Sequence, residues 1–165
     1  MQIFSFDDYT LPAIKLSQLL EKPLNIIKVH HFPDGEASIR LQDKMVPHMV
    51  IIRSLDQPNE KLIELLLSCK TARQNGVQRI TLIAPYLCYM RQDIAFHRGE
   101  SVSQQIIGQF LADMVDDIIT VDPHLHRIDH LSQAIPCNNA VTISAMDSIA
   151  THIKQNYYDL IVGPD

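Results

Sequence analysis

Side chains that can do chemistry gather in the segment IITVDPHLHRIDH, residues 118–130, directly after an apolar β-branched run. Asp122 and His124 flank a proline at the end of this run, and His126 and His130 follow. A zinc site needs three or four ligands, and no cysteine lies nearby. Mg²⁺ needs fewer, because one histidine and one carboxylate suffice where a nucleotide supplies phosphate oxygens. Asp122 and His124 are compatible with such a site, whereas we expect His126 and His130 to lie in a short following helix without a chemical role.

Two other segments carry candidate ligand-binding side chains. Arg91, Gln92 and Asp93 form a donor-rich triplet, in which arginine can hold a phosphate in bidentate fashion and glutamine can read a base edge. A solvated polar loop would have the same composition. FPDGE, residues 32–36, joins an aromatic ring to two carboxylates around a tight turn. Locally it indicates a hairpin with acidic turn residues, and the alternative is a ring that stacks on a base beside acceptors for an exocyclic amine.

The elements that must position these residues alternate between strand and helix. The predicted strands span residues 2–6, 25–32, 37–41, 49–52, 80–84, 118–121 and 160–162, and the predicted helices span 11–20, 59–75, 101–114 and 145–154. Ser101 and Gln104 form a capping-box pattern at the start of the third helix. The alternation predicts a three-layer α/β fold, with a mostly parallel sheet and helices on both faces. Ligands bind such sheets outside the carboxyl ends of the strands, where polar segments follow here.

Composition narrows the class of protein. The chain has 165 residues, enough for one core, and a formal net charge of −5, which argues against nucleic-acid binding through bulk charge. Its three widely spaced cysteines argue against a disulfide framework and favour a cytoplasmic location. No signal peptide and no run of membrane-spanning length is expected. With five glycines and no P-loop or dinucleotide-binding motif, a Walker or Rossmann phosphate loop is excluded.

Several segments together resemble the ribose-phosphate pyrophosphokinases, also called phosphoribosyl pyrophosphate synthetases. They occur in the family's order and cover nearly the whole chain: FPDGE at 32–36, PNEKLIELLLSCKTAR at 58–73, RITLIAPYLCYMRQD at 79–93, RGESVS at 98–103, TVDPHL at 120–125 and GPD at 163–165. The RQD segment followed by the D-x-H strand end is specific. Details such as the proline in DPHL are more similar to divergent and archaeal-type members.

The resemblance implies type I phosphoribosyltransferase-like α/β domains that transfer diphosphate from Mg-ATP to ribose 5-phosphate, giving phosphoribosyl pyrophosphate and AMP. It implies a homo-oligomer in which an adenine-contacting loop reaches the ATP bound by a neighbouring subunit. The residues that match this loop are Phe32, Asp34 and Glu36, and those that match the ATP-binding segment are Arg91, Gln92 and Asp93. His124 matches the catalytic residue beside Mg²⁺, and Asp165 matches a second residue that holds the metal.

The resemblance also implies that residues 1–142 form the N-terminal domain and residues 143–165 begin a second one, which family members continue. We expect the 165-residue chain to be inactive alone, because the ribose 5-phosphate loop and the flexible basic loop would lie in that continuation. One alternative is a non-catalytic regulatory subunit associated with a synthetase. Others are a structural or assembly domain and a phosphoribosyltransferase, although the latter needs an acidic pair and a Thr-Gly-rich loop that this sequence lacks.

Overall fold

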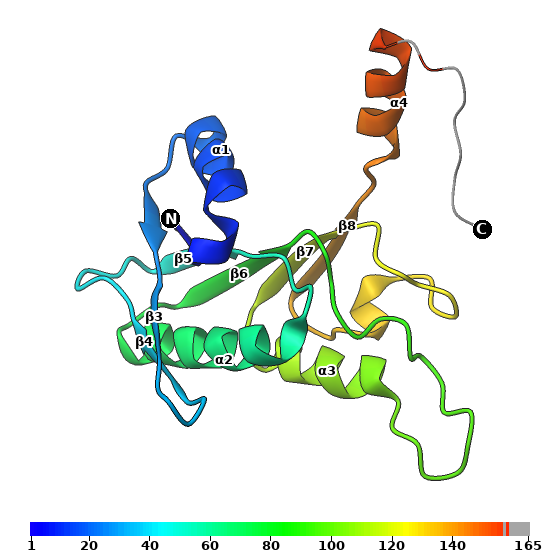
Figure 1. Ribbon diagram of the computed structural model, residues 1–165, viewed down its shortest axis with the longest axis horizontal. Coiled ribbons are helices and arrows are strands. Elements are labelled where there is room, and N and C mark those ends of the chain that lie inside the picture. Colours follow the sequence, from blue (N-terminus) through cyan, green and yellow to red (C-terminus); the bar gives the residue numbers. More distant parts are fainter. Residues whose placement is uncertain (157, 159–165) are drawn as a thin grey trace.

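The predicted parallel sheet is present, and it organises the molecule (Figure 1). The computed structural model describes residues 1–156 and 158. Within this part the sheet has six strands in the order β2-β1-β5-β6-β7-β8, and every neighbouring pair is parallel. The strands are β1 (Gln2–Ser5), β2 (Leu24–Ile26), β5 (His48–Ile52), β6 (Arg79–Ala84), β7 (Asp117–Val121) and β8 (Asn139–Ile143). A separate antiparallel hairpin pairs β3 (Lys28–His31) with β4 (Ala37–Arg40).

Helices cover both faces of the sheet, as the sequence predicts (Figure 1). On one face, the 3-10 turn η1 (Asp7–Tyr9) leads into α1 (Thr10–Leu20), whose Ala13 packs against Ile3 and Val50. On the other, α2 (Pro58–Gln74) and α3 (Ser103–Ala112) enclose the larger core. The turn η2 (Leu131–Gln133) follows β7. Among the described residues, no helix is both long enough and apolar enough to cross a membrane.

The prediction of one continuous strand over residues 25–32 is wrong, because the chain leaves the large sheet midway through this segment. Ile26 still pairs with β1, and the N–H of Ile27 donates to the carbonyl of Ser5. From Lys28 onward the chain pairs with β4 instead. Ile27 is buried in the core at the point of divergence. An apolar run can therefore pass from one sheet to another without any break in its hydrophobicity.

Strand β8 was not predicted, and α4 (Met146–Gln155) matches the last predicted helix closely. β8 lies at the edge of the sheet, so most of its residues are exposed and the apolar signal of a buried strand is missing. The helix α4 has no buried residue and stands away from the sheet in Figure 1. The predicted domain boundary after residue 142 falls beside the end of β8. The strand predicted over 160–162 lies outside the described residues.

The Asp117 carboxylate joins three neighbouring strands at the amino end of β7. It accepts hydrogen bonds from Arg79 Nε at 2.7 Å, Thr81 Oγ1 at 2.9 Å and Asn139 Nδ2 at 2.6 Å. These bonds, that of Arg79 above all, lower the pKa of Asp117 from 3.8 to about 2. A carboxyl with a depressed pKa stabilises the fold above its unfolded-state value, and this contribution is lost as the pH falls toward 2.

Wild-type protein should therefore exceed Asp117→Asn in free energy of unfolding by on the order of 2 kcal/mol at about pH 5. The difference should shrink steadily as the pH is lowered toward about 2.5, because the Asp117 carboxyl of the unfolded chain takes up its proton at a higher pH than that of the folded protein. Urea denaturation of both proteins across this range measures the effect. A difference that stays constant with pH would contradict this account of Asp117.

Candidate functional site

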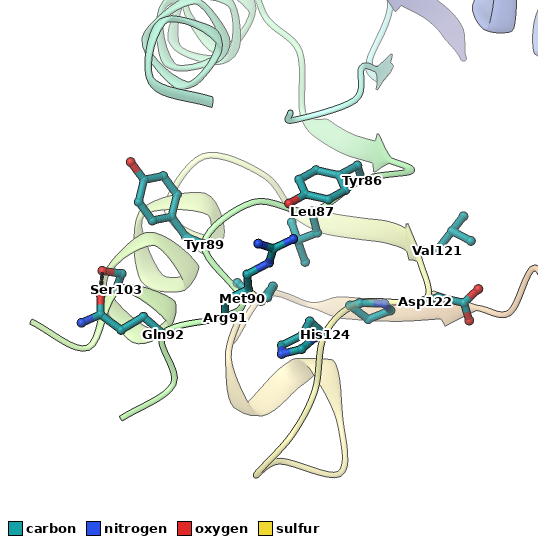
Figure 2. Close-up of a pocket in the computed structure, with 11 residues that line it drawn as sticks. Tyr86, Leu87, Tyr89, Met90, Arg91, Gln92, Ser103, Val121, Asp122 and His124 are labelled. Atoms are coloured by element: carbon teal, nitrogen blue, oxygen red, sulfur yellow. Dashed lines mark hydrogen bonds between the residues drawn. The ribbon is translucent and has the colours of Figure 1, made fainter. Parts of the chain in front are cut away.

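A cavity of about 440 Å³ lies at the carboxyl ends of β6 and β7 (Figure 2). One wall is the segment after β6, a second is the end of β7, and the start of α3 completes it. Its lining residues are Tyr86, Leu87, Tyr89, Met90, Arg91, Gln92, Ser103, Val121, Asp122, Pro123 and His124. This is the edge of a parallel sheet at which ligands bind. Three of the predicted site residues, Arg91, Gln92 and His124, are thus brought together from two separate loops.

Arg91 supplies a positive charge to the cavity. In Figure 2 its side chain extends between Tyr86 and His124. Arg91 is exposed, and it forms no ion pair with any residue of the described part of the chain. A guanidinium without a protein counter-charge can bind a phosphate group through two parallel hydrogen bonds. Arg91 is therefore available to an anionic ligand.

Gln92 is oriented by the first turn of α3. Ser103 Oγ donates to Gln92 Oε1 at 2.6 Å, so the carboxamide oxygen is occupied and the NH₂ group remains to donate to a ligand. The backbone N–H of Gln104 donates to the Gln92 carbonyl at 3.1 Å. The buried side chain of Gln104 donates to the carbonyl of Met90 at 3.2 Å. Together these bonds attach the segment that carries Arg91 to the helix.

Ser103 and Gln104 were not predicted as site residues. The pattern of Ser101 and Gln104 predicts a capping box, but α3 begins at Ser103 and no side chain caps its first turn. That part of the prediction is wrong, because the Gln104 side chain serves the cavity wall rather than its own helix. The available signal in the sequence was a glutamine in the first turn of a predicted helix. Its role is clear only from the path of the preceding loop, which brings the Met90 carbonyl to the Gln104 side chain.

His124 faces the cavity, whereas Asp122 does not serve it with its carboxylate. Asp122 adopts a left-handed backbone conformation, with φ of 40°. Its Oδ2 accepts a hydrogen bond from the N–H of Ala145 at 2.9 Å, and in Figure 2 the carboxylate points away from His124. Asp122 therefore ties the end of β7 to the start of α4. The pairing of Asp122 with His124 around one metal ion, considered from the sequence, is not the arrangement in the structure.

The other two histidines of the segment are not on a helix. Residues 124–130 form a loop, and η2 begins only at Leu131. The His126 ring lies 4.0 Å from that of His124, centroid to centroid, and the His130 N–H donates to the Gln133 side chain. Within residues 1–156 and 158, no group of three histidine, cysteine or acidic side chains could hold a metal. Asp165, the other residue predicted to hold a metal ion, lies outside the described residues.

Tyr89 occupies a strained position on the cavity wall. Its φ of 58° places a bulky aromatic residue in the left-handed region, which costs of order 1–3 kcal/mol. The Tyr89 hydroxyl donates to Asn59 Oδ1 at 2.5 Å, so the side chain anchors the loop to the start of α2. Backbone strain of this kind occurs where a loop is held in one conformation for a ligand.

The FPDGE turn lies apart from this cavity, at the tip of the β3–β4 hairpin (Figure 1). Phe32 is 44% exposed, and Asp34 Oδ1 accepts from the N–H of Glu36 at 3.1 Å. Gly35 has a φ of 90°, which the turn requires and which only glycine adopts without strain. Glu36 lines a second cavity, of about 510 Å³, between the hairpin and α2. Phe32, Asp34 and Glu36 thus do not join Arg91, Gln92 and His124.

Asp93 also does not line the first cavity. Its carboxylate accepts from Arg127 Nη1, with distances of 2.7 and 2.9 Å to its two oxygens. This hydrogen bond lowers the pKa of Asp93. Arg91 and Asp93 are only two residues apart, but Arg91 lines the cavity whereas Asp93 contacts Arg127.

Comparisons with known proteins identify the family of this chain. The family model of the N-terminal domain of ribose phosphate pyrophosphokinase matches residues 1–114. The chain belongs to the ribose-phosphate pyrophosphokinase family. Among relatives named ribose-phosphate pyrophosphokinase, the Methanopyrus kandleri protein is 31% identical over 92% of this chain and 52% of its own length. The Methanothermobacter thermautotrophicus protein is 32% identical over 93% of this chain and 53% of its own length.

A solved member of the family has the same fold. The crystal structure of phosphoribosylpyrophosphate synthetase from Mycobacterium smegmatis matches with a TM-score of 0.79 and 21% identity, over 94% of this chain and 52% of that one. The fold class predicted from the sequence is thereby confirmed. This chain spans about half the length of the curated relatives that it matches.

Proposed function

We propose that this chain supplies the ATP-binding half of a ribose-phosphate diphosphokinase, which forms phosphoribosyl pyrophosphate and AMP from Mg-ATP and ribose 5-phosphate. The observation that carries the proposal is the meeting of Arg91, Gln92 and His124 in one strand-end cavity, within a chain of this family. Residues 1–142 would form the N-terminal domain, and 143–165 would begin the second. Ribose 5-phosphate would bind in the remaining half of such a protein, so these 165 residues alone would bind nucleotide without completing the reaction.

The proposed reaction needs positioning and charge stabilisation rather than a protein nucleophile. The C1 hydroxyl oxygen of ribose 5-phosphate forms a bond to the β-phosphorus of ATP and loses its proton. The bond from that phosphorus to the α–β bridging oxygen breaks, and AMP leaves. Arg91 would bind the polyphosphate, the Gln92 NH₂ group would donate to a nucleotide acceptor, and the catalytic residue His124 would lie beside the reacting phosphates.

The few metal ligands that the cavity offers fit Mg²⁺ only when the ion is bound as the Mg-ATP complex. His124 offers one imidazole there, and the Asp122 carboxylate is occupied by the Ala145 amide. Mg²⁺ tolerates few protein ligands when phosphate oxygens and water supply the others. His124 and Asp165 would be its protein ligands, and the bound cation would neutralise charge on the phosphates.

The hairpin residues fit a role in a neighbouring subunit. Phe32 is exposed at the tip of the hairpin, and none of the three hairpin residues lines the cavity that contains Arg91 and His124 in its own chain. We therefore propose a cytoplasmic homo-oligomer in which Phe32, Asp34 and Glu36 contact the adenine bound by another copy. Asp93 is proposed to serve the same nucleotide indirectly, by holding the wall of the cavity.

Arg91→Ala should raise the dissociation constant of Mg-ATP by about 10- to 100-fold, since a charge-assisted hydrogen bond contributes about 1.5–3 kcal/mol. Isothermal titration calorimetry measures this change. Lys70→Ala is the matched control, because it removes one exposed positive charge from α2 and Lys70 does not line the cavity. Equal affinity of wild type and Arg91→Ala would contradict the proposal and would favour a non-catalytic subunit.

A further inference from the structure

One ion pair links the two loops that form the cavity. Arg127 lies in the loop after β7, three residues beyond His124, and Asp93 lies in the loop after β6, two residues beyond Arg91. Arg127 Nη1 is 2.7 Å from Asp93 Oδ1 and 2.9 Å from Oδ2. Neither residue is among those that line the cavity. The pair is therefore a cross-link behind the walls that carry the two functional side chains.

The two partners differ in burial. The Asp93 side chain is 5% exposed, and the Arg127 side chain is 53% exposed. Within the described residues Arg127 is the cation that contacts the Asp93 carboxylate. A buried carboxylate without its cation is strongly unfavourable. The Asp93 carboxylate therefore keeps the exposed Arg127 side chain in contact with it, although Arg127 could otherwise extend into water. The pair therefore differs from an ordinary surface ion pair, in which both side chains are free to move.

The loop that carries His124 has few polar attachments, although Leu125 and Ile128 pack against the core. Residues 122–130 contain no helix or strand. At its start, the Asp122 N–H donates to the carbonyl of Ile143, and near its end the Asp129 N–H donates to the Gln133 side chain. Between these points Arg127 provides the contact with the opposite wall of the cavity. The wall opposite is itself fixed to α3 through Gln104.

We propose that Arg127 is a positioning residue, which acts through Asp93 to set the distance between His124 and Arg91. The inference rests on the proposed function and extends it, because it gives the cavity a residue that touches no substrate. A cavity that must present a cation and an imidazole to the same polyphosphate loses affinity when the two drift apart. Arg127 thus determines how well the two walls bind one ligand together.

The alternative is that Arg127 binds phosphate directly, and a double-mutant cycle separates the two roles. Arg127→Gln and Asp93→Asn should each lower the affinity for Mg-ATP by about 5- to 10-fold, and the double variant should lose no more than either one. Arg127→Lys, which keeps the charge, should return to within about twofold of wild type. Deuterium uptake of residues 122–130 should rise in both single variants without nucleotide.

Lys28→Gln is the control, because it removes a similarly exposed cation from the pair between Lys28 and Asp7. Its affinity for Mg-ATP should equal that of wild type. Additive losses in the cycle would overturn the inference and make Arg127 a direct ligand. Unchanged affinity in both single variants would overturn it while leaving the proposed function intact. Wild-type protein that binds no Mg-ATP would overturn the proposed function, and this inference with it.

Discussion

Arg53→Ala should lower the free energy of unfolding by about 3–5 kcal/mol, the cost of removing one partner from a buried ion pair. Arg53 follows β5, and its side chain is 7% exposed. Its Nη1 lies 2.6 Å from Oε2 of Glu64, whose side chain is 5% exposed. Its Nε donates to Asp8 at 3.1 Å, and its guanidinium lies 3.9 Å from the centroid of the Phe6 ring. Without Arg53, the Glu64 carboxylate stays buried with only the half-exposed His31 beside it.

Urea denaturation of wild type and Arg53→Ala measures this loss. The double variant Arg53→Met/Glu64→Met is the control, because replacing both charges with apolar side chains removes the stranded carboxylate. It should be more stable than Arg53→Ala. A loss below about 1 kcal/mol in Arg53→Ala would contradict this prediction, because it would mean that the buried pair contributes no more than an exposed ion pair. Arg53 lies at the carboxyl end of a strand, where ligands bind such sheets, but its contacts with Asp8 and Glu64 are structural.

Gly108→Ala should destabilise the protein by about 3 kcal/mol, because α3 and the chain around η2 are in backbone contact at this position. A Cβ added to Gly108 would lie 1.9 Å from the carbonyl oxygen of Ala134 and 2.8 Å from its carbon. These atoms belong to the backbone, so one element must move away from the other. The movement would also disturb the cavity, since α3 holds the wall that carries Gln92.

Thermal and urea unfolding of Gly108→Ala measure the loss of stability, and Mg-ATP titration measures the effect on the cavity. Gln105→Ala is the matched control, because Gln105 is exposed on the same helix and its replacement should change stability by less than about 0.5 kcal/mol. If Gly108→Ala and Gln105→Ala unfold alike, α3 does not approach η2 as closely as described.

Periodicity and apolar runs predicted the elements whose faces are buried. β5, β6 and β7 are mostly apolar, buried strands, and α2 contributes Leu62, Leu65 and Cys69 to the core. β8 was not predicted, because an edge strand needs few apolar residues. The break at Ile27 was not predicted, because Ile27 is a buried core residue and the apolar pattern continues through the point where the two sheets diverge. The local hydrophobic pattern therefore predicted the buried strands and helices, but not the positions where the chain passes from one sheet to another.

The strand-end rule and the family resemblance located Arg91, Gln92 and His124, which the structure brings together. The contacts that hold them were not predictable, because Gln104 and Arg127 act across loops whose paths no local pattern encodes. In each case the side chain satisfies a buried polar group far away in sequence.

The most direct test of the central claim is a Mg-ATP titration followed residue by residue through backbone amide chemical shifts. The account predicts that the largest changes cluster at residues 86–92, at the start of α3 and at residues 121–124 around His124. The same changes should be weak in Arg91→Ala. Changes centred on the second cavity, between Glu36 and Glu64, with none around Arg91, would contradict the account.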